Sequence, residues 1–525
     1  MRSTPVIVIH SAFGLLPMLE YELEIAQRHL DEGARVVFLQ CKGNVSQCHV
    51  NNPIGRPIKR ICWACKSRVT AGLNWLNIDK GFLEIREFEF ISPQQMEVIE
   101  SCMSATKPDT LDSGTIRKIW NISDVDIYEA ALSTMVGRYR NPLITPKDNA
   151  TLFQVLLKTS LVAYFSFSNH INVIGPDLCY VFNGRIARYR PPLRLCQQLD
   201  LNMFSYEYPL VGYKRYSLFN GIYPHDLDAA SNQFLDAYNS SLLSEKDKLR
   251  IGNWRYRMRT KGNRKPKPRP DGLSISDDIG LLNVLIATST EYEYAGITGA
   301  NIGHFYENQV DALQQIFSDL ASEMTFVVRT HPNAAKDEWF VVEEMVQLSS
   351  KYSSVRVVLP NSNEDTYALV AQSDLVVTFG STVGAEAAFM GKPVITIGSA
   401  FYKSFGLSVH PSSHSEVLSL LRFASAGNYR NFPVASTRYI GAVKFAFATM
   451  FFGVKSKYVR RDSYEGGGML RGGKLLKLKP RMIFTFINTC AQYVGRIVRG
   501  TIWLLESTQI KYNELIVTKH STLPR

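Results

Sequence analysis

Three polar clusters in the second half of the sequence follow short apolar runs, where strands of a parallel sheet would end. They are Thr288–Glu291, Arg329–Asn333 (RTHPN) and Thr378–Glu386 (TFGSTVGAE). In open parallel sheets, ligands bind beyond the carboxyl ends of the strands. We therefore expect the three clusters to share one edge of a sheet and to meet around one ligand.

The third cluster has the composition of a phosphate site. Gly380 permits a tight turn, and Ser381 or Thr382 can cap the helix that begins there. Free amides and the positive end of the helix dipole then favour an anion. Gly384 would let the helix or a ligand approach closely, and Glu386 can reach a ribose hydroxyl or a ligand amine. Taken alone, such a helix start is structural as often as functional.

The second cluster adds a His-Pro pair to the same edge. His331 would donate a hydrogen bond to a phosphate oxygen, and Arg329 would add positive charge if it points the same way. Pro332 would fix the imidazole by restricting the backbone. The structural alternative is a rigid loop with a capping histidine.

The first cluster is less specific. Ser289 is a further candidate for binding the same ligand, whereas Glu291 and Glu293 are expected to be exposed loop acids.

Four cysteines near the N-terminus have a spacing that could bind a metal. Cys41, Cys48, Cys62 and Cys65 form the pattern C-x6-C-x13-C-x2-C. Four thiolates with a closing C-x2-C can hold Zn²⁺ tetrahedrally, although the first pair is wider than usual. Structural zinc, unligated thiols, an iron–sulfur cluster and disulfides all stay open, and no catalytic cofactor is expected.

The elements that must position these residues alternate between strand and helix, which predicts an α/β fold with two Rossmann-like domains. Between residues 280 and 425, strands are predicted at 281–288, 325–330, 355–359, 374–379 and 393–397, with helices at 308–320, 340–350, 366–372 and 383–389. Residues 5–40 begin the first domain as a strand–helix–strand unit with a right-handed crossover.

The length of the chain fits two domains and an appendage. We assign residues 1–250 to the N-terminal domain with the cysteine cluster and residues 276–425 to the C-terminal domain. Residues 251–275 are assigned to a basic linker, because Arg255–Pro270 carries eight Lys or Arg residues and three prolines. Residues 426–525 form a basic, amphipathic C-terminal extension with an expected helix near Met482–Leu505, which packs either on the protein or on a membrane.

The net charge of +12 and the pI near 9.1 favour anionic partners such as sugar nucleotides, acidic glycans or phospholipid headgroups. Nucleic acid is disfavoured, because the basic residues gather in the linker and the tail and no nucleic-acid-binding motif is present. No run of about 18 uninterrupted apolar residues marks a transmembrane helix. A cytoplasmic location is expected, and peripheral attachment to the inner membrane is left open.

The second-domain motifs carry a family resemblance. The run RTHPN, Trp339, NEDTYALVAQSDLVVTFGSTVGAEAAFMGKPVI and Tyr402 resemble the bacterial capsule polysaccharide biosynthesis proteins, which are glycosyltransferases of the two-domain GT-B type. In the first half, FNGR (182–185), YEY (206–208) and PHD (224–226) resemble the acceptor-side motifs of that family. The resemblance covers roughly residues 1–425.

The resemblance implies a metal-independent glycosyltransferase that builds a capsular or lipopolysaccharide glycan from a CMP-, CDP- or UDP-linked sugar, on a glycan or lipid-linked acceptor. His331, Ser381 and Thr382 would hold the phosphates of the donor, and Glu386 its ribose or sugar. The residues facing the acceptor would be Arg185, Glu207, His225 and Asp226. In an inverting reaction, Glu207 or His225 would deprotonate the acceptor hydroxyl.

Two other functions fit the same residues. A phosphotransferase that moves an alditol phosphate from a CDP-linked donor would use the same phosphate site. A non-catalytic scaffold of a polysaccharide assembly complex would instead use the basic linker and tail.

Overall fold

The first domain is built on a sheet whose central strands are continuous apolar runs, as expected where helices cover both faces. The computed structural model describes residues 4–11, 13–43, 48, 59–105, 127–260, 281–295, 297, 305–334, 339–461, 467–471 and 474–477. The first sheet has the strand order β12-β6-β5-β4-β1-β2-β3. Its strands are β1 (Val6–His10), β2 (Arg35–Gln40), β3 (Phe82–Glu87), β4 (Leu178–Phe182), β5 (Met203–Glu207), β6 (Arg215–Asn220) and β12 (Val454–Lys455).

The five strands β1 to β5 of this sheet are parallel to one another, whereas β6 is antiparallel to β5 and β12 is antiparallel to β6. The helices of this domain are α1 (Met18–Asp31), α2 (Lys59–Leu73), α3 (Pro93–Ala105), α5 (Ile127–Tyr139), α6 (Ala150–Ile174), α7 (Arg190–Gln198), α8 (Leu227–Asn239) and α9 (Glu245–Thr260).

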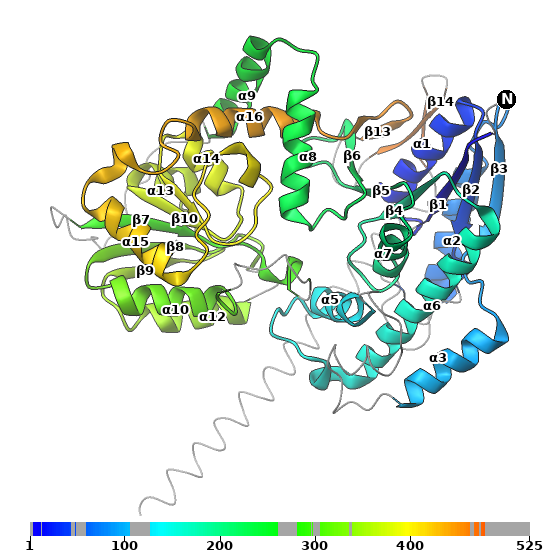
Figure 1. The fold of residues 1–525 in the computed structure, drawn as a ribbon, viewed down its shortest axis with the longest axis horizontal. Coiled ribbons are helices and arrows are strands. Elements are labelled where there is room, and N and C mark those ends of the chain that lie inside the picture. Colours follow the sequence, from blue (N-terminus) through cyan, green and yellow to red (C-terminus); the bar gives the residue numbers. More distant parts are fainter. Residues whose placement is uncertain are drawn as a thin grey trace, which may run out of the picture.

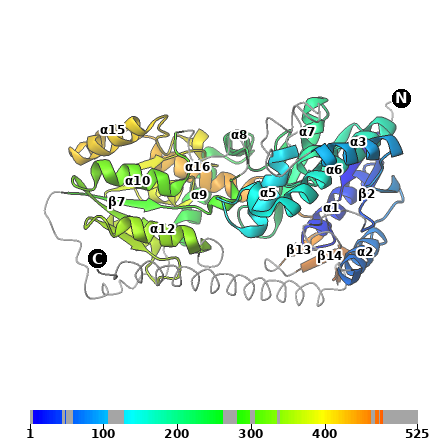
Figure 2. The same ribbon diagram turned by 90° about the horizontal axis from the view of Figure 1, so that it is seen from below.

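The second domain is a five-stranded, fully parallel sheet with the strand order β11-β10-β7-β8-β9. Its strands are β7 (Leu282–Ala287), β8 (Met324–Arg329), β9 (Val355–Val358), β10 (Leu375–Thr378) and β11 (Val394–Thr396). Its helices are α10 (Gln309–Leu320), α12 (Trp339–Ser349), α13 (Thr366–Gln372), α14 (Val383–Phe389) and α15 (His414–Ser425). The two domains lie side by side (Figures 1 and 2), and the α/β class with two Rossmann-like domains is confirmed.

The expected linker differs from the structure in its first part. Residues 251–260 continue helix α9, which packs against α16 (Arg438–Phe451), and residues 261–275 lie outside the described part of the chain. The composition of α9 is strongly polar, but four of its residues are buried: Lys248, Gly252, Tyr256 and Thr260. Gly252 allows the close contact, since a Cβ there would lie 2.1 Å from the carbonyl oxygen of Val443.

The first part of the expected C-terminal extension belongs to both domains. Helix α16 contacts α14 of the second domain and α8 and α9 of the first half of the chain. The chain then returns to the first sheet as β12 and continues in a small antiparallel sheet of β13 (Val459–Arg461), β14 (Gly467–Arg471) and β15 (Lys474–Leu476). The amphipathic helix expected near residues 482–505 lies outside the described residues.

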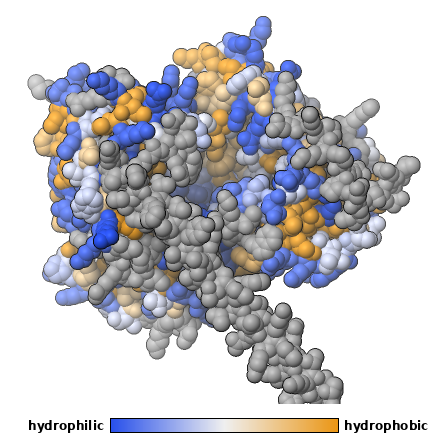
Figure 3. Space-filling model, turned by 180° about the vertical axis from the view of Figure 1, so that it is seen from behind, coloured by the Kyte–Doolittle hydropathy of each residue, from blue (hydrophilic) through white to orange (hydrophobic). Residues whose placement is uncertain are grey.

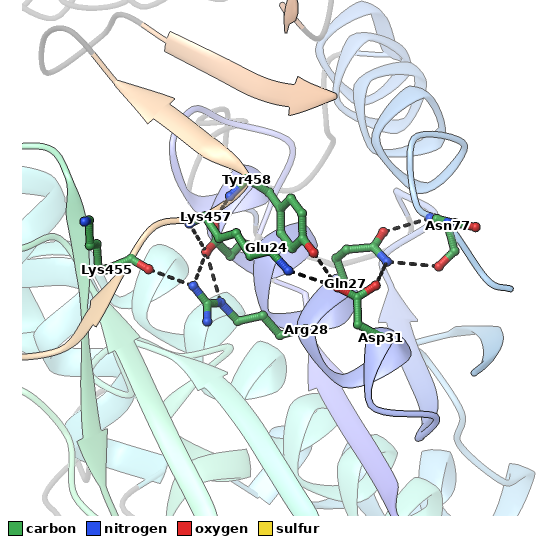
Figure 4. Close-up of polar contacts among 8 residues, drawn as sticks. All are labelled: Glu24, Gln27, Arg28, Asp31, Asn77, Lys455, Lys457 and Tyr458. Carbon is green, nitrogen blue, oxygen red and sulfur yellow. Dashed lines mark hydrogen bonds and ion pairs between the residues drawn. The ribbon is translucent and has the colours of Figure 1, made fainter. Parts of the chain in front are cut away.

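A buried carboxylate anchors this returning segment on α1 (Figure 4). Glu24 accepts hydrogen bonds from the backbone N–H groups of residues 457, 458 and 459 at 2.6, 2.8 and 2.9 Å. Arg28 pairs with Glu24 and also donates to the carbonyl oxygen of Lys455 at 2.7 Å. One acidic side chain therefore holds a segment more than 400 residues away in sequence.

One described helix, Pro146–Ile174, is long and apolar enough to cross a membrane by length and composition, with a mean hydropathy of 1.3. Slightly more than half of its apolar window, 56%, is buried inside the protein, where α6 packs against α3, α5 and α7. Polar residues such as Lys158 and Asn169 interrupt it, which is why the sequence pattern did not single it out.

Candidate functional site

The predicted polar clusters leave the second sheet at the same level. In the register of the strands, Thr378 of β10 is paired with Ala287 of β7, and Ala287 is paired with Arg329 of β8. The residues that follow these three positions therefore emerge together at the carboxyl edge, with the β7 loop between the other two. Neighbouring strands are about 4.8 Å apart, so the β8 and β10 loops are separated by roughly 10 Å at the sheet.

His331 is held by the loop after β7. Its backbone N–H donates to Thr288 Oγ1 at 3.0 Å, and Thr290 Oγ1 lies 3.4 Å from its Nδ1. Its Nδ1 accepts the backbone N–H of Asn333 at 3.2 Å. Because Nδ1 is an acceptor, the neutral ring carries its proton on Nε2.

The Nε2–H group of His331 is thus a donor, and no other described residue bonds to it. Burial lowers the pKa of His331, and Arg329 lowers it further, so the ring donates as a neutral group at neutral pH.

The turn at Gly380 is confirmed as a glycine-specific position. Its φ is +77°, and a Cβ there would lie 2.6 Å from the carbonyl oxygen of Ser399. The Ser381 N–H donates to Thr378 Oγ1 at 3.0 Å, and Ser381 Oγ accepts the Val383 N–H at a long 3.4 Å. Thr382 is the N-cap of α14, but its side chain makes no capping bond, and its backbone N–H has no partner among the described residues.

Gly384 does not make room for a ligand. A Cβ at this position would lie 2.5 Å from the Tyr402 hydroxyl and 2.8 Å from Thr378 Cγ2. The Tyr402 hydroxyl donates to the carbonyl oxygen of Ser381 at 2.9 Å. The group that approaches Gly384 closely is therefore the buried Tyr402, and its hydrogen bond to Ser381 stabilises the Gly380 turn.

Glu386 is buried and already paired. It forms an ion pair with Arg259 of α9, and the Tyr367 hydroxyl donates to it at 3.0 Å. Burial raises the pKa of Glu386, and Arg259 opposes that rise. In the structure this residue joins α14 to α9, so contact with a ribose would require it to exchange partners.

Arg329 does not point toward the expected phosphate site. Its guanidinium donates to the carbonyl oxygen of Leu359 at 2.6 Å and approaches Thr366 Oγ1 at 3.4 Å. These groups follow β9, on the side of β8 away from β7. Arg329 therefore fixes the loop after β9, which corrects the expected role in donor binding.

The loop after β7 differs from expectation in its acids. Glu291 is buried and accepts the Gln309 N–H at 3.3 Å, and burial raises its pKa to about 7. Burial also raises the pKa of Glu293, against the effect of Arg185. Neither is an exposed loop acid. The backbone of Ser289 is held by the amide of Gln309 at 2.9 and 3.1 Å, so Ser289 is well positioned at the edge.

Three of the four expected acceptor-side residues come together against this loop. Arg185 is buried and donates to Ser133 Oγ and to the carbonyl oxygen of Tyr292, both at 2.7 Å. It acts electrostatically on both Glu207 and Glu293, one from each domain. Arg185 therefore joins the first domain to the β7 loop of the second.

Glu207 is the stronger candidate for a base. It accepts hydrogen bonds from the side chain of Asn183 and from the Tyr208 N–H, and burial raises its pKa. His225 differs: burial, with Arg185 and Arg190, lowers its pKa to about 3, and its Nδ1 is buried without a hydrogen-bond partner in the part of the chain that the structure describes. A ring that holds a proton so weakly is a poor base at neutral pH.

Asp226 has a structural role. Its side chain accepts the Ala229 N–H at 3.2 Å and caps the N-terminus of α8. Its expected place on the acceptor side stays a prediction.

Two of the four clustered cysteines accept hydrogen bonds from backbone N–H groups. Cys41 Sγ accepts the Gly43 N–H at 3.2 Å, and Cys65 Sγ accepts the Gly14 N–H at 3.1 Å. Burial raises the pKa of Cys65 to about 11. Among the described residues, no group of three or more His, Cys, Asp or Glu side chains is arranged to hold a metal ion. The structural zinc site stays a prediction.

Residues 298–421 match the model of a family described as "Capsule polysaccharide biosynthesis protein". The match includes RTHPN, the Gly380 turn and Tyr402. For that part of the chain, the resemblance expected from the sequence is confirmed. A comparison with curated proteins found no match.

Solved structures give partial likenesses. The β-Kdo 2,4 transferase KpsC of Thermosulfurimonas dismutans is 15% identical, with 52% of this chain and 79% of that chain covered and a TM-score of 0.33. A UDP-GlcNAc 2-epimerase from Neisseria meningitidis, bound to UDP-GlcNAc, is 10% identical, with 85% and 97% covered and a TM-score of 0.28. A glycosyltransferase from Rickettsia africae is 12% identical, with 86% and 95% covered and a TM-score of 0.29.

Proposed function

We propose that the protein is a glycosyltransferase that transfers a sugar from a nucleotide donor to a growing bacterial surface glycan. The observation that carries the proposal is the arrangement at the carboxyl edge of the second sheet. There, His331 presents Nε2–H on one side of the β7 loop, and the Gly380 turn presents the Thr382 N–H on the other. The family match over residues 298–421 supports it.

The leaving group explains why these donors are placed there. A nucleotide gains negative charge as the bond to the sugar breaks, and fixed N–H donors in a partly buried site stabilise that charge without reorganising. His331 can do this as a neutral donor, so no divalent metal is required by the proposal. The donor is a CMP-, CDP- or UDP-linked sugar.

The acceptor side is assigned to the contact between the domains. Glu207 is the base in an inverting reaction. Arg185 acts electrostatically on Glu207 and Glu293 while it donates to the carbonyl oxygen of Tyr292 in the β7 loop. In this proposal the acceptor is a glycan or lipid-linked glycan, and the protein acts in the cytoplasm. A phosphotransferase would use the same donor site, so analysis of the product of turnover distinguishes the two reactions.

Thermal-shift measurements with CMP, CDP, UDP, GDP and their sugars test the donor site. A ligand at a hundred times its dissociation constant stabilises the protein by about 2.7 kcal/mol. We expect one nucleotide series to stabilise the wild-type protein and His331→Ala to abolish that shift.

His414→Ala is the matched control, because His414 lies in the same domain but at the start of α15, where it pairs with Asp319 of α10. It should keep the shift. A His331→Ala protein that is stabilised as strongly as the wild type would refute the proposed donor site, and a protein that binds nucleotide without any turnover would favour a scaffold.

A further inference from the structure

Helix α9 leaves one side exposed along its length. It projects at the top of Figure 1, beyond the level of both sheets. Its buried side faces α16, and the close contact at Gly252 fixes which side that is. The opposite side carries Lys246, Arg250, Trp254, Arg257 and Met258 at helical spacings of three and four residues, and all five are exposed.

This exposed stripe is apolar as well as cationic. Trp254 is 55% exposed and Met258 is 57% exposed. The turn between α8 and α9 adds two leucines, Leu242 and Leu243, of which Leu242 is fully exposed. Figure 3 shows hydrophobic next to hydrophilic surface at the top of the molecule, where this region lies.

The charge on α9 is strongly positive. The helix has six Lys or Arg residues and two acids. Both acids are engaged within the protein: Asp247 with Ser244 and Arg250, and Glu245 with Tyr238 and Lys248. Lys246 and Arg257 have no ion-pair partner among the described residues, so their charge is available to an outside partner.

We propose that α9 and the α8–α9 turn form a docking surface for an anionic phospholipid bilayer. An indole prefers the level of the headgroups, and basic residues beside it are attracted to anionic lipids. The leucines and Met258 would enter the outer part of the acyl region. A soluble acidic glycan would match the cations and would stack on Trp254, but it would leave the two leucines and Met258 in water. This proposal does not rest on the transferase reaction.

Vesicle flotation tests the proposal with the full-length protein and no donor or acceptor present. We expect binding to vesicles of equal parts phosphatidylcholine and phosphatidylglycerol, and little binding to phosphatidylcholine alone. The double variant Lys246→Glu/Arg257→Glu should weaken binding at least about tenfold, since each cation near the surface contributes about 1 kcal/mol. Trp254→Ser should weaken it about tenfold by removing an apolar group that the bilayer would bury.

The chain offers a matched control on α2. Trp63 is 60% exposed there and is flanked by the exposed Lys59, Arg60 and Lys66. Trp63→Ser and Lys59→Glu/Lys66→Glu should leave vesicle binding unchanged.

Three results would overturn the proposal. The first is equal binding to neutral and anionic vesicles, and the second is loss of binding in the α2 variants with retention in the α9 variants. The third is tight binding to a soluble polyanion such as heparin that Trp254→Ser does not weaken, because that would identify a polyanion site instead. All variants alter exposed side chains, and unchanged thermal unfolding checks that each is folded.

Discussion

The substitution Glu24→Gln should release the segment that ties the C-terminal part of the chain to the first domain. Both carboxylate oxygens of Glu24 are used: Oε1 by the 457 N–H and Arg28, and Oε2 by the 458 and 459 N–H groups. The amide of glutamine has only one acceptor oxygen. Its NH2 group would face at least one backbone N–H, and the attraction to Arg28 would be lost.

The magnitude follows from the number of bonds. A hydrogen bond to a charged group contributes about 1.5–3 kcal/mol, and a buried donor left without a partner costs a further 1–3 kcal/mol. Losing one such bond should therefore lower the free energy of unfolding by about 2.5–6 kcal/mol, a large part of the roughly 5–15 kcal/mol that holds a typical domain folded.

Chemical denaturation measures the global effect, and hydrogen exchange of the amides of residues 457–459 measures the local one. We expect both to change in Glu24→Gln. The control is Glu32→Gln on the same stretch of chain, because Glu32 is largely exposed and only approaches His29 at 3.8 Å. If the two variants unfold at the same denaturant concentration and the three amides exchange as slowly as in the wild type, the anchoring argument is wrong.

Three further predictions concern the site. Burial raises the pKa of Glu291 to about 7, above its usual value near 4.5. The stability contributed by its protonated form is therefore present below about pH 4.5 and is lost as the pH rises toward 7. Glu291→Gln should flatten the curve of unfolding free energy against pH by about 3 kcal/mol over that window. Gly384→Ala should destabilise the protein by about 1–3 kcal/mol through overpacking against Tyr402, and Tyr402→Phe should restore part of that loss in thermal unfolding, whereas an equal loss in the double variant would contradict the contact. Glu207→Gln should reduce turnover about 100-fold or more with nucleotide binding intact, while His225→Gln should reduce it far less; the reverse order in single-turnover rates would make His225 the base.

The edge of the second sheet could be predicted from the sequence because its logic is local. Apolar runs marked the strands, parallel strands end at one edge, and the polar residues after each run were therefore neighbours. Gly380 was also predictable, since a Gly before Ser-Thr at the end of a strand is typical of a left-handed turn. The placement of His331 at this edge needed no information beyond these patterns, whereas the order of the strands in the sheet was read from the structure.

The misplaced residues depend on contacts that the sequence does not encode locally. Arg259 pairs with Glu386 across 127 positions, and its polar, basic surroundings suggested a linker because α9 is buried on a narrow side only. The packing of Tyr402 on Gly384 likewise gave no local signal. Asp226 is different: an Asp directly before a helix is a common N-cap, and that signal was present in the sequence.

The return of the chain through α16 and β12 means that the chain passes between the two domains twice, once before the second sheet and once after it. Truncation before residue 438 would remove helix α16, which packs on α14 of the second domain, and the edge strand β12 of the first sheet. The two domains should consequently be difficult to express apart.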